Sequence, residues 1–203
     1  MLFSILFADL PITFTSYCSF YGLKLTCVPI SAGSYDFGAI DESKYEGNIT
    51  YTAVNTSLGL WEFSSDRYKI GDKTYEDGSV DGIADTGTTL LLLPDDVVVN
   101  YYEQVEGALY LAEYAGFVFP CGTDLPSFTY TISTNGSDSG KDIVIPGLYM
   151  TFSPADDLGG CYGAIQSSDG LGVNIYGDVA LKAAYVVFRG GDSPELGFAS
   201  KAQ

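Results

Sequence analysis

The sequence predicts a mainly β fold organised as one large domain. Charged residues make up only 17% of the 203 residues, whereas the chain carries 24 glycines, 16 tyrosines and 12 phenylalanines. Short apolar stretches are separated by turn residues, which is typical of a β-rich protein. A chain of this length can bury one substantial hydrophobic core, and no internal repeat, low-complexity tract or long charged linker divides it.

Most of the expected elements are short strands bounded by glycine or polar residues. In chain order they are expected at 35–40, 49–54, 61–63, 67–70, 73–75, 80–84, 128–133, 142–145, 161–165, 173–176, 184–189 and 196–199. A turn is expected at 41–47, a hairpin turn at Gly71-Asp72, and a loop over the polar stretch 133–141.

One helix is predicted directly after Pro94. Asp95 and Asp96 can cap its start. Its apolar residues fall at helical spacing, namely Val98, Tyr101, Tyr102 and Val105. A second, shorter helical turn is expected to run from Gly177 to Lys182, with Asp178 as its N-cap.

The composition restricts the kinds of catalytic and metal-binding site that this chain can form. The chain contains no histidine, so it can form neither a Ser-His-Asp or Cys-His relay nor a zinc site that uses imidazole. Acid–base chemistry must therefore depend on carboxylates, tyrosines or lysines. A formal net charge of −17 argues against nucleic acid or an anionic membrane as a partner. The same charge suits a protein that works in acid, although simple solubility explains it equally well.

Asp85 is the best candidate for a chemically active side chain. It lies in the tight turn 82–89, between an apolar entry and the apolar run 90–93. A carboxylate in this position sits at a strand end, close to backbone and hydroxyl donors and backed by apolar side chains. Such surroundings can adjust an acid for catalysis.

Several ordered segments resemble the C-terminal lobe of a pepsin-like aspartic protease, nearest to the fungal secreted enzymes of the endothiapepsin kind. An Asp-Thr-Gly triplet alone is weak evidence, but here the apolar-apolar-glycine element Ile175, Tyr176, Gly177 follows it at the family's distance. The further matching segments are 34–41, 47–51, 118–121, 143–147, 174–182 and 196–199.

The resemblance implies one lobe of the bilobal acid protease fold, in which Asp85 is one of two catalytic aspartates. It implies that 175–177 brace the aspartate loop, that Thr86 reaches across to its counterpart in the other lobe, and that Thr88 hydrogen-bonds the outer oxygen of Asp85. Gly87 would present its backbone to the carboxylates and the substrate. Taken singly, each residue could equally belong to an ordinary glycine turn.

The same pattern suggests substrate contacts for Gly87 and Thr88, and also for Leu92 and Ile165. Leu92 occupies a position where relatives often carry an aromatic residue, and Ile165 lies on a strand expected to face the cleft. Both could instead be plain core residues. The implied partners are a peptide or protein substrate and, once the site is complete, pepstatin-type inhibitors; no cofactor or metal is expected.

Only one aspartate loop of the required kind is present. The triplet 138–140 lies in a polar run without a bracing partner, and Tyr21-Gly22 lacks the polar hairpin of the family's substrate-covering flap. We therefore expect residues 1–10 to be the entry strand from an absent N-terminal lobe, 11–31 to be an unmatched insertion, and 32–203 to be the C-terminal lobe. The insertion could be a gene-model error such as a translated intron, a genuine insertion with its own disulfide, or a signal peptide without basic flanks.

Four cysteines suggest an oxidising compartment, consistent with secretion. The resemblance implies a disulfide between Cys121 and Cys161. Pairing of Cys18 with Cys27 is suggested only because these are the two remaining cysteines. Sequons at 48, 55 and 135 permit glycosylation in a secreted chain.

The leading hypothesis is a secreted acid endopeptidase represented by its C-terminal half, inactive as a monomer. A homodimer that brings together two copies of Asp85 is a second enzyme hypothesis. The non-enzyme alternative is a β-rich peptide-binding or inhibitory module that has lost catalysis.

Overall fold

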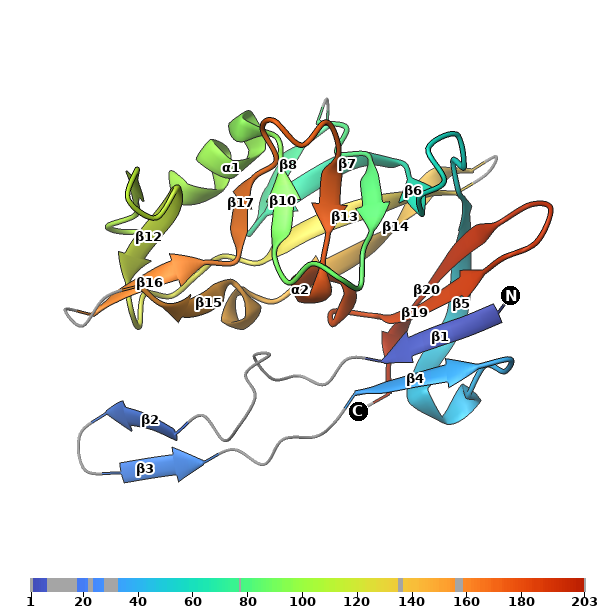
Figure 1. Cartoon of the computed structure of the whole chain (residues 1–203), viewed down its shortest axis with the longest axis horizontal. Helices are drawn as coiled ribbons and strands as arrows, with labels where there is room; N and C mark the ends of the chain where they lie inside the picture. Colours follow the sequence, from blue (N-terminus) through green and yellow to red (C-terminus); the bar gives the residue numbers. More distant parts are fainter. Residues whose placement is uncertain are drawn as a thin grey trace.

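The computed structural model describes residues 2–6, 18–21, 24–27, 33–76, 78–134, 137–155 and 159–202. The regular structure of this part of the chain is mainly β strand (Figure 1). The strands are β1 (Leu2–Leu6), β2 (Cys18–Tyr21), β3 (Lys24–Cys27), β4 (Ser34–Phe37), β5 (Tyr45–Ala53), β6 (Glu62–Phe63), β7 (Ser65–Ile70), β8 (Lys73–Tyr75), β9 (Gly82–Ala84), β10 (Leu91–Leu93), β11 (Leu109–Leu111), β12 (Gly116–Pro120), β13 (Phe128–Thr134), β14 (Ser137–Ile145), β15 (Thr151–Pro154), β16 (Gly160–Gly163), β17 (Ile165–Ser167), β18 (Asn174–Tyr176), β19 (Tyr185–Arg189) and β20 (Glu195–Lys201).

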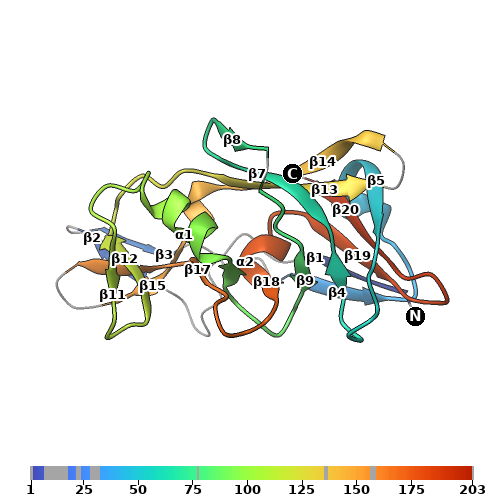
Figure 2. The same cartoon turned by 90° about the horizontal axis from the view of Figure 1, so that it is seen from above.

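Two short α-helices accompany the strands, α1 (Asp95–Tyr102) and α2 (Asp178–Leu181). Single 3₁₀ turns cover Glu42–Lys44 and Gly147–Tyr149. Seen from above, α1 lies beside β17, which it contacts (Figure 2). The predicted mainly β fold with a short helix after the aspartate turn is therefore confirmed.

The strands form four larger sheets and one separate hairpin. The sheet orders are β4-β1-β19-β20-β5, β17-β10-β18-β9-β6, β11-β12-β16-β15, β14-β13-β7-β8 and β2-β3. The sheet β17-β10-β18-β9-β6 positions the aspartate turn, because β9 leads into the turn and β10 leads out of it. Strand β18 lies between these two, parallel to β9 and antiparallel to β10.

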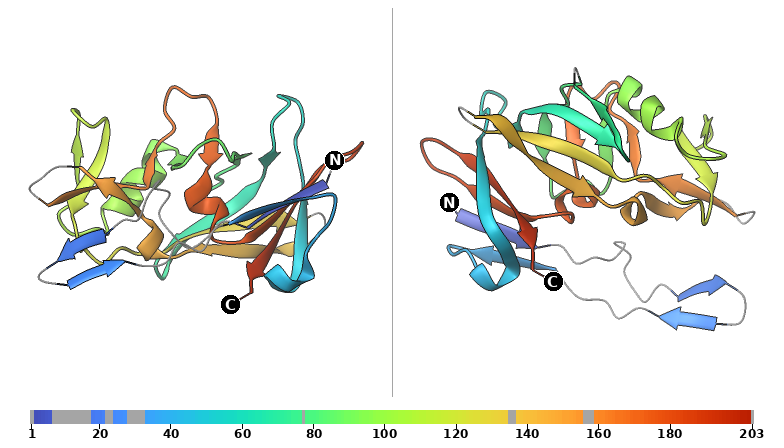
Figure 3. Two further views of the ribbon diagram at one scale, coloured as in Figure 1. Left: turned by 60° about the horizontal axis from the view of Figure 1, so that its bottom comes forward. Right: turned by 180° about the vertical axis from the view of Figure 1, so that it is seen from behind.

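The first and last strands share one sheet (Figure 3). Strand β1 pairs antiparallel with β19 on one side and with β4 on the other, so that Leu6 lies opposite Ser34. Residues 7–33 therefore connect two neighbouring antiparallel strands. Within this connection, β2 and β3 pair only with each other, with Cys18 opposite Cys27. The assignment of 1–10 as an entry strand and 11–31 as an insertion stays a prediction.

One aromatic-rich core stabilises the sheets. The rings of Phe63, Tyr130, Tyr176 and Phe198 are all buried, and Tyr176 lies 4.7 Å from Tyr130 and 4.8 Å from Phe63 between ring centroids. Burying aromatic side chains supplies a large hydrophobic contribution, to which ring packing adds about 1 kcal/mol a pair. Because Tyr176 belongs to β18, this core also fixes the brace beside Asp85.

Three local expectations were wrong. Most of the stretch 133–141 was expected to be a loop, but its described residues, 133–134 and 137–141, belong to β13 and β14, which pair up to Thr134 and Ser137. Asp95 and Asp96 do not cap α1, because its N-cap is Pro94. Both acids lie in the first turn, where their negative charges interact favourably with the positive end of the helix dipole. Likewise Asp178 is the first residue of α2 and not its N-cap, which is Gly177.

Candidate active site

Asp85 lies directly after β9, and its carboxylate is held by two donors from its own turn. The backbone N–H of Gly87 donates to Asp85 Oδ1 at 2.8 Å, and the hydroxyl of Thr88 donates to Oδ2 at 2.6 Å. Hydrogen bonds to an ionised acceptor are stronger than neutral ones and restrict the rotation of the carboxylate. The bond from Thr88 that the resemblance implied is therefore present, and Asp85 is a half-buried residue whose carboxylate has a defined orientation.

Strand β18 and the start of α2 brace this turn from behind. The backbone N–H of Asp85 donates to the carbonyl of Tyr176 at 3.1 Å, and that of Gly177 donates to Leu90 at 3.2 Å. The next two N–H groups, of Asp178 and Val179, donate to the carbonyls of residues 88 and 89 at 2.8 and 3.0 Å. Residues 175–177 thus connect both arms of the turn, as the family resemblance implied, and Figure 1 shows α2 beside the end of the turn that leads into β10.

Gly177 is required by the closeness of this contact. A Cβ atom at Gly177 would lie 2.3 Å from the carbonyl oxygen of Thr88 and 2.4 Å from that of Leu90. Both neighbours are backbone atoms that already accept hydrogen bonds from the brace, so neither can move away cheaply. Only glycine allows the two chain segments to approach this closely.

Tyr176 anchors the brace in the core. Its side chain is fully buried, and its hydroxyl donates to the carbonyl of Val80 at 2.6 Å. The bond ties β18 to the segment that leads into β9. Ile175, its neighbour, is half-buried.

Thr86 and Gly87 are the exposed residues of the turn. Thr86 is therefore accessible to a partner surface, although its contact with a second lobe stays a prediction. A Cβ atom at Gly87 would meet Asp85 Oδ1 at 3.2 Å, so the absence of a side chain keeps the approach to the carboxylate open.

The two expected substrate-contacting side chains occupy different surroundings. Leu92 on β10 is half-buried and retains exposed surface. Ile165 on β17 has no exposed surface, and its carbonyl accepts the hydroxyl proton of buried Tyr102 at 2.7 Å. For Ile165 the geometry thus favours the core role that the sequence left open. Its contact with a substrate would require the site to rearrange.

Asp178 is the residue near the turn that sequence reasoning did not assign to the site. Its Oδ1 atom is buried, with no hydrogen-bond partner among the described residues. Burial, followed by the negative charge of Asp85, raises the pKa of Asp178 to about 6, which Lys182 partly opposes. Its position directly after the bracing glycine could have indicated that it lies near the site. From the sequence alone, Asp178 is instead interpreted only as a helix N-cap.

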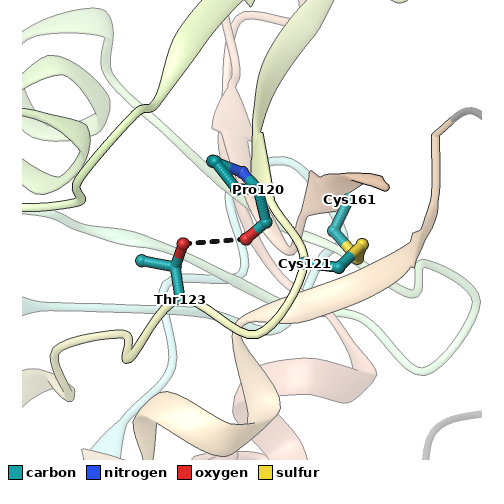
Figure 4. The surroundings of a disulfide bond; sticks show 4 residues. All are labelled: Pro120, Cys121, Thr123 and Cys161. Carbon is teal, nitrogen blue, oxygen red and sulfur yellow. Dashed lines mark hydrogen bonds between the residues drawn. A yellow bond between two sulfur atoms is a disulfide. The ribbon is translucent and has the colours of Figure 1, made fainter. Parts of the chain in front are cut away.

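The disulfide implied by the resemblance is present. Cys121 and Cys161 are bonded, with Cα atoms 5.1 Å apart and a sequence separation of 40 (Figure 4). They join the ends of the paired strands β12 and β16. Closing a loop of this length stabilises the folded state by about 4 kcal/mol in the chain-entropy model. Beside it, the hydroxyl of Thr123 donates to the carbonyl of Pro120 at 2.8 Å.

Within the described residues, no group of three or more Asp, Glu or Cys side chains is arranged to hold a metal ion. In the same part of the chain, no helix has the length and apolar character needed to cross a membrane.

These contacts define a class of site: a single carboxylate, oriented by its own turn and braced by a separate strand, at the end of a β lobe. The chain belongs to the eukaryotic aspartyl protease family, whose model matches residues 18–201. The match begins at Cys18, within the segment that the sequence pattern left unmatched.

Curated fungal proteases are similar over most of this chain. Endothiapepsin of Cryphonectria parasitica is 53% identical over 170 residues, covering 83% of this chain and 39% of that protein. Aspergillopepsin-1 of Aspergillus fumigatus is 51% identical over 171 residues, covering 84% and 42%. Podosporapepsin of Podospora anserina is 49% identical over 174 residues, covering 84% and 39%. The chain thus spans about two fifths of the length of these relatives.

Proposed function

We propose that this chain supplies one half of the active site of an aspartic endopeptidase, with Asp85 as its catalytic carboxyl. The observation that carries the proposal is the fixed carboxylate, which receives hydrogen bonds from Gly87 and Thr88 in a turn braced by β18. Family membership supports the reaction class. A second lobe would supply the partner aspartate and the flap that covers the substrate.

The chemistry requires two carboxyls that share one proton, because two like charges at close range cannot both ionise readily. One carboxylate takes a proton from the water that attacks the peptide carbonyl, and the other carboxyl donates a proton to the carbonyl oxygen. The bonds that Asp85 receives from Gly87 and Thr88 hold its carboxylate in one orientation, and the shared water would bind against it. Gly87 and Thr88 at the open side of the turn, together with Leu92, would contact an extended peptide substrate.

The proposal includes an acidic extracellular setting. The sequence pI is about 4.1, so the self-repulsion of the carboxylates relaxes as the pH falls. The disulfide between Cys121 and Cys161 fits an oxidising compartment. Pepstatin-type inhibitors would bind only once a second lobe completes the site.

Reconstitution with a separate N-terminal lobe tests the proposal. The chain is mixed with the N-terminal half of endothiapepsin, and cleavage of a protein substrate is followed at acid pH with and without pepstatin. We expect pepstatin-sensitive cleavage by the mixture and none by either half. Replacing Asp85 with Asn should reduce the rate by roughly 10⁴-fold or more, as removal of a catalytic group does in other proteases.

Two outcomes would contradict the proposal. Activity that survives Asp85→Asn would place catalysis elsewhere, and pepstatin-sensitive cleavage by the chain alone would show that no second lobe is needed. Sedimentation of an active chain would then test the homodimer hypothesis. Peptide binding without turnover in the complemented protein would instead favour the non-catalytic module.

A further inference from the structure

Asn55 begins an exposed turn in the connection between β5 and β6. Residues 55–60 are all exposed, and this connection projects from the body of the ribbon in the left view of Figure 3. Leu58 and Leu60 are 64% and 39% exposed, so even the apolar side chains of the turn contribute little to the core. A bulky group attached to this turn would therefore displace no packed side chain.

The turn contains one of the three acceptor motifs for N-linked glycosylation. The motif is Asn, then any residue except Pro, then Ser or Thr, and here it is Asn55-Thr56-Ser57. The other two motifs begin at Asn48 and Asn135, and Asn135 lies outside the described residues. The two motifs that the structure describes differ in local conformation.

At Asn55 the motif is folded back on itself. The backbone N–H of Ser57 donates to Asn55 Oδ1 at 3.1 Å, which is the bond of an Asx turn. The turn continues with a bond from the N–H of Gly59 to the carbonyl of Thr56 at 2.9 Å. This conformation brings the first and third residues of the motif together, so that one enzyme site can hold the amide and the hydroxyl at the same time.

At Asn48 the motif is extended instead. Asn48 and Thr50 belong to β5, and Thr50 lies opposite Phe198 of β20. Two residues along a strand span about 7 Å, so this motif must leave the sheet before its two ends can meet. Asn48 is also exposed, and accessibility alone therefore does not separate the two asparagines.

The amide of Asn55 can carry a sugar without losing its contact in the fold. Its Nδ2 donates to Glu62 Oε2 at 2.6 Å, and the backbones of the two residues form an isolated bridge. Attachment of a sugar replaces one of the two hydrogens on Nδ2, and the other can still donate to the carboxylate. This charge-assisted bond would keep the linkage oriented.

We propose that Asn55, in preference to Asn48, carries an N-linked glycan when the chain is secreted. In this reaction Nδ2 of Asn55 forms a bond to C1 of a lipid-linked oligosaccharide, the bond from C1 to the diphosphate of the lipid breaks, and the amide proton leaves to a base. No oxidant or reductant is needed. The inference rests on the extracellular setting included in the proposed function, because this motif is modified in secreted proteins.

Expression of the full chain behind a secretion signal in yeast tests the proposal. The protein is treated with peptide N-glycosidase F in heavy-oxygen water, which converts each glycosylated Asn into a labelled Asp. Chymotrypsin cleavage after Tyr51 places Asn48 and Asn55 on separate peptides for mass spectrometry. We expect the label at position 55 in most molecules and at position 48 in a minority. The same peptides are analysed from any chain retained inside the cell.

Matched variants separate the motif from its position in the fold. Ser57→Ala removes the required hydroxyl and keeps Asn55, so it should abolish the label at position 55, whereas Ser57→Thr should retain it. Asn55→Gln should remove the mass of one glycan from most molecules, and Asn48→Gln should leave the main glycosylated mass in place. Circular dichroism of each variant establishes that the fold is retained.

The proposal is overturned if position 55 is unlabelled, or if position 48 is labelled to an equal or greater extent. Asn55→Gln does not alter the aspartate turn and should leave the activity of the reconstituted enzyme unchanged. An unlabelled Asn55 in a chain that becomes active on reconstitution would refute this inference alone. A labelled Asn55 in a chain that stays inactive would leave the inference intact and refute the proposed function.

Discussion

At the scale of single residues, the hydroxyl of Thr88 fixes one oxygen of Asp85. The bond is 2.6 Å long and is made within the turn, so it needs no second lobe to form. A hydrogen bond to a charged group contributes about 1.5–3 kcal/mol. We therefore expect Thr88→Val to lower kcat/KM of the reconstituted enzyme by about 10- to 100-fold, as measured with a chromogenic peptide.

Thr88→Ser is the matched control, because it keeps the hydroxyl and removes only a methyl group. It should retain most of the activity. Equal losses in the serine and valine variants would show that the methyl packing of Thr88 matters more than its bond to Asp85.

At the scale of elements, the brace formed by β18 and α2 depends on Gly177. A Cβ atom there would collide with two backbone carbonyl oxygens at 2.3 and 2.4 Å. Overpacking of this kind costs about 1–3 kcal/mol. We expect Gly177→Ala to lower the free energy of unfolding by about this amount, measured by urea denaturation.

Gly87→Ala provides the contrasting variant within the same site. Its added Cβ would meet only a side-chain oxygen, Asp85 Oδ1, at 3.2 Å. It should leave stability nearly unchanged and reduce the activity of the reconstituted enzyme. If Gly177→Ala were as stable as Gly87→Ala, the close packing of the brace at Gly177 would not contribute to stability as proposed.

The sheet β14-β13-β7-β8 carries a charge network centred on Asp142. Lys69 lies 2.5 Å from Asp142 Oδ2, Thr131 donates to Oδ1 at 2.7 Å, and Arg67 lies 3.8 Å away. Burial alone would raise the pKa of Asp142, but the hydrogen bonds from Lys69 and Thr131, aided by the charges of Lys69 and Arg67, outweigh it and lower the pKa below 3.8.

Because this pKa is lower in the folded chain than in the unfolded chain, the network stabilises the fold above about pH 4 and loses its effect as the pH falls through the folded pKa. Asp142→Asn should therefore destabilise the chain at pH 6 and have little effect at pH 2, measured by urea denaturation at each pH. Asp192→Asn should show no such difference. A pH-independent loss in Asp142→Asn would mean that the charge of Asp142 is not the stabilising feature.

The sequence predicted elements best where local chemistry decided them. Strand β8 and the Gly71-Asp72 turn agree with expectation, because an alternating run and a glycine at positive φ determine them locally. Strands β11, β12 and β15 were not expected, since their pairing partners, and not their own patterns, hold them in place. The cap assignments failed because Asp is favoured at N-caps and in the first turn alike.

For the candidate site too, only the locally determined features could be predicted from the sequence. The turn around Asp85 and its brace could be predicted from an ordered motif, and the bonds from Gly87 and Thr88 are local to that motif. The pKa of Asp178 and the full burial of Ile165 could not, because both depend on which distant segments pack against them. Burial and charge proximity are tertiary properties that a single residue type does not reveal.

At the scale of the whole molecule, the pairing of β1 with β4 indicates why the sheet can form with the long segment 7–33 between these two strands. Leu6 lies opposite Ser34, so these strand ends are already adjacent, and β2 and β3 form a separate hairpin. Closing a loop costs about 0.6 kcal/mol for each doubling of its length. Removing residues 11–31 leaves a short connection that can still join β1 to β4, and it should therefore stabilise the chain by about 1 kcal/mol.

Urea denaturation of the full chain and of the chain without residues 11–31 measures this effect. The prediction is that the shortened chain unfolds at an equal or higher urea concentration and regains the same activity on reconstitution, because β2 and β3, the described part of the deleted segment, lie outside the sheet that carries Asp85. The double variant Cys18→Ser/Cys27→Ser in the full chain is the control. It separates the effect of loop length on stability from the effect of a disulfide between these two cysteines. A marked loss of stability on deletion would show instead that 11–31 packs against the lobe and belongs to its folded unit.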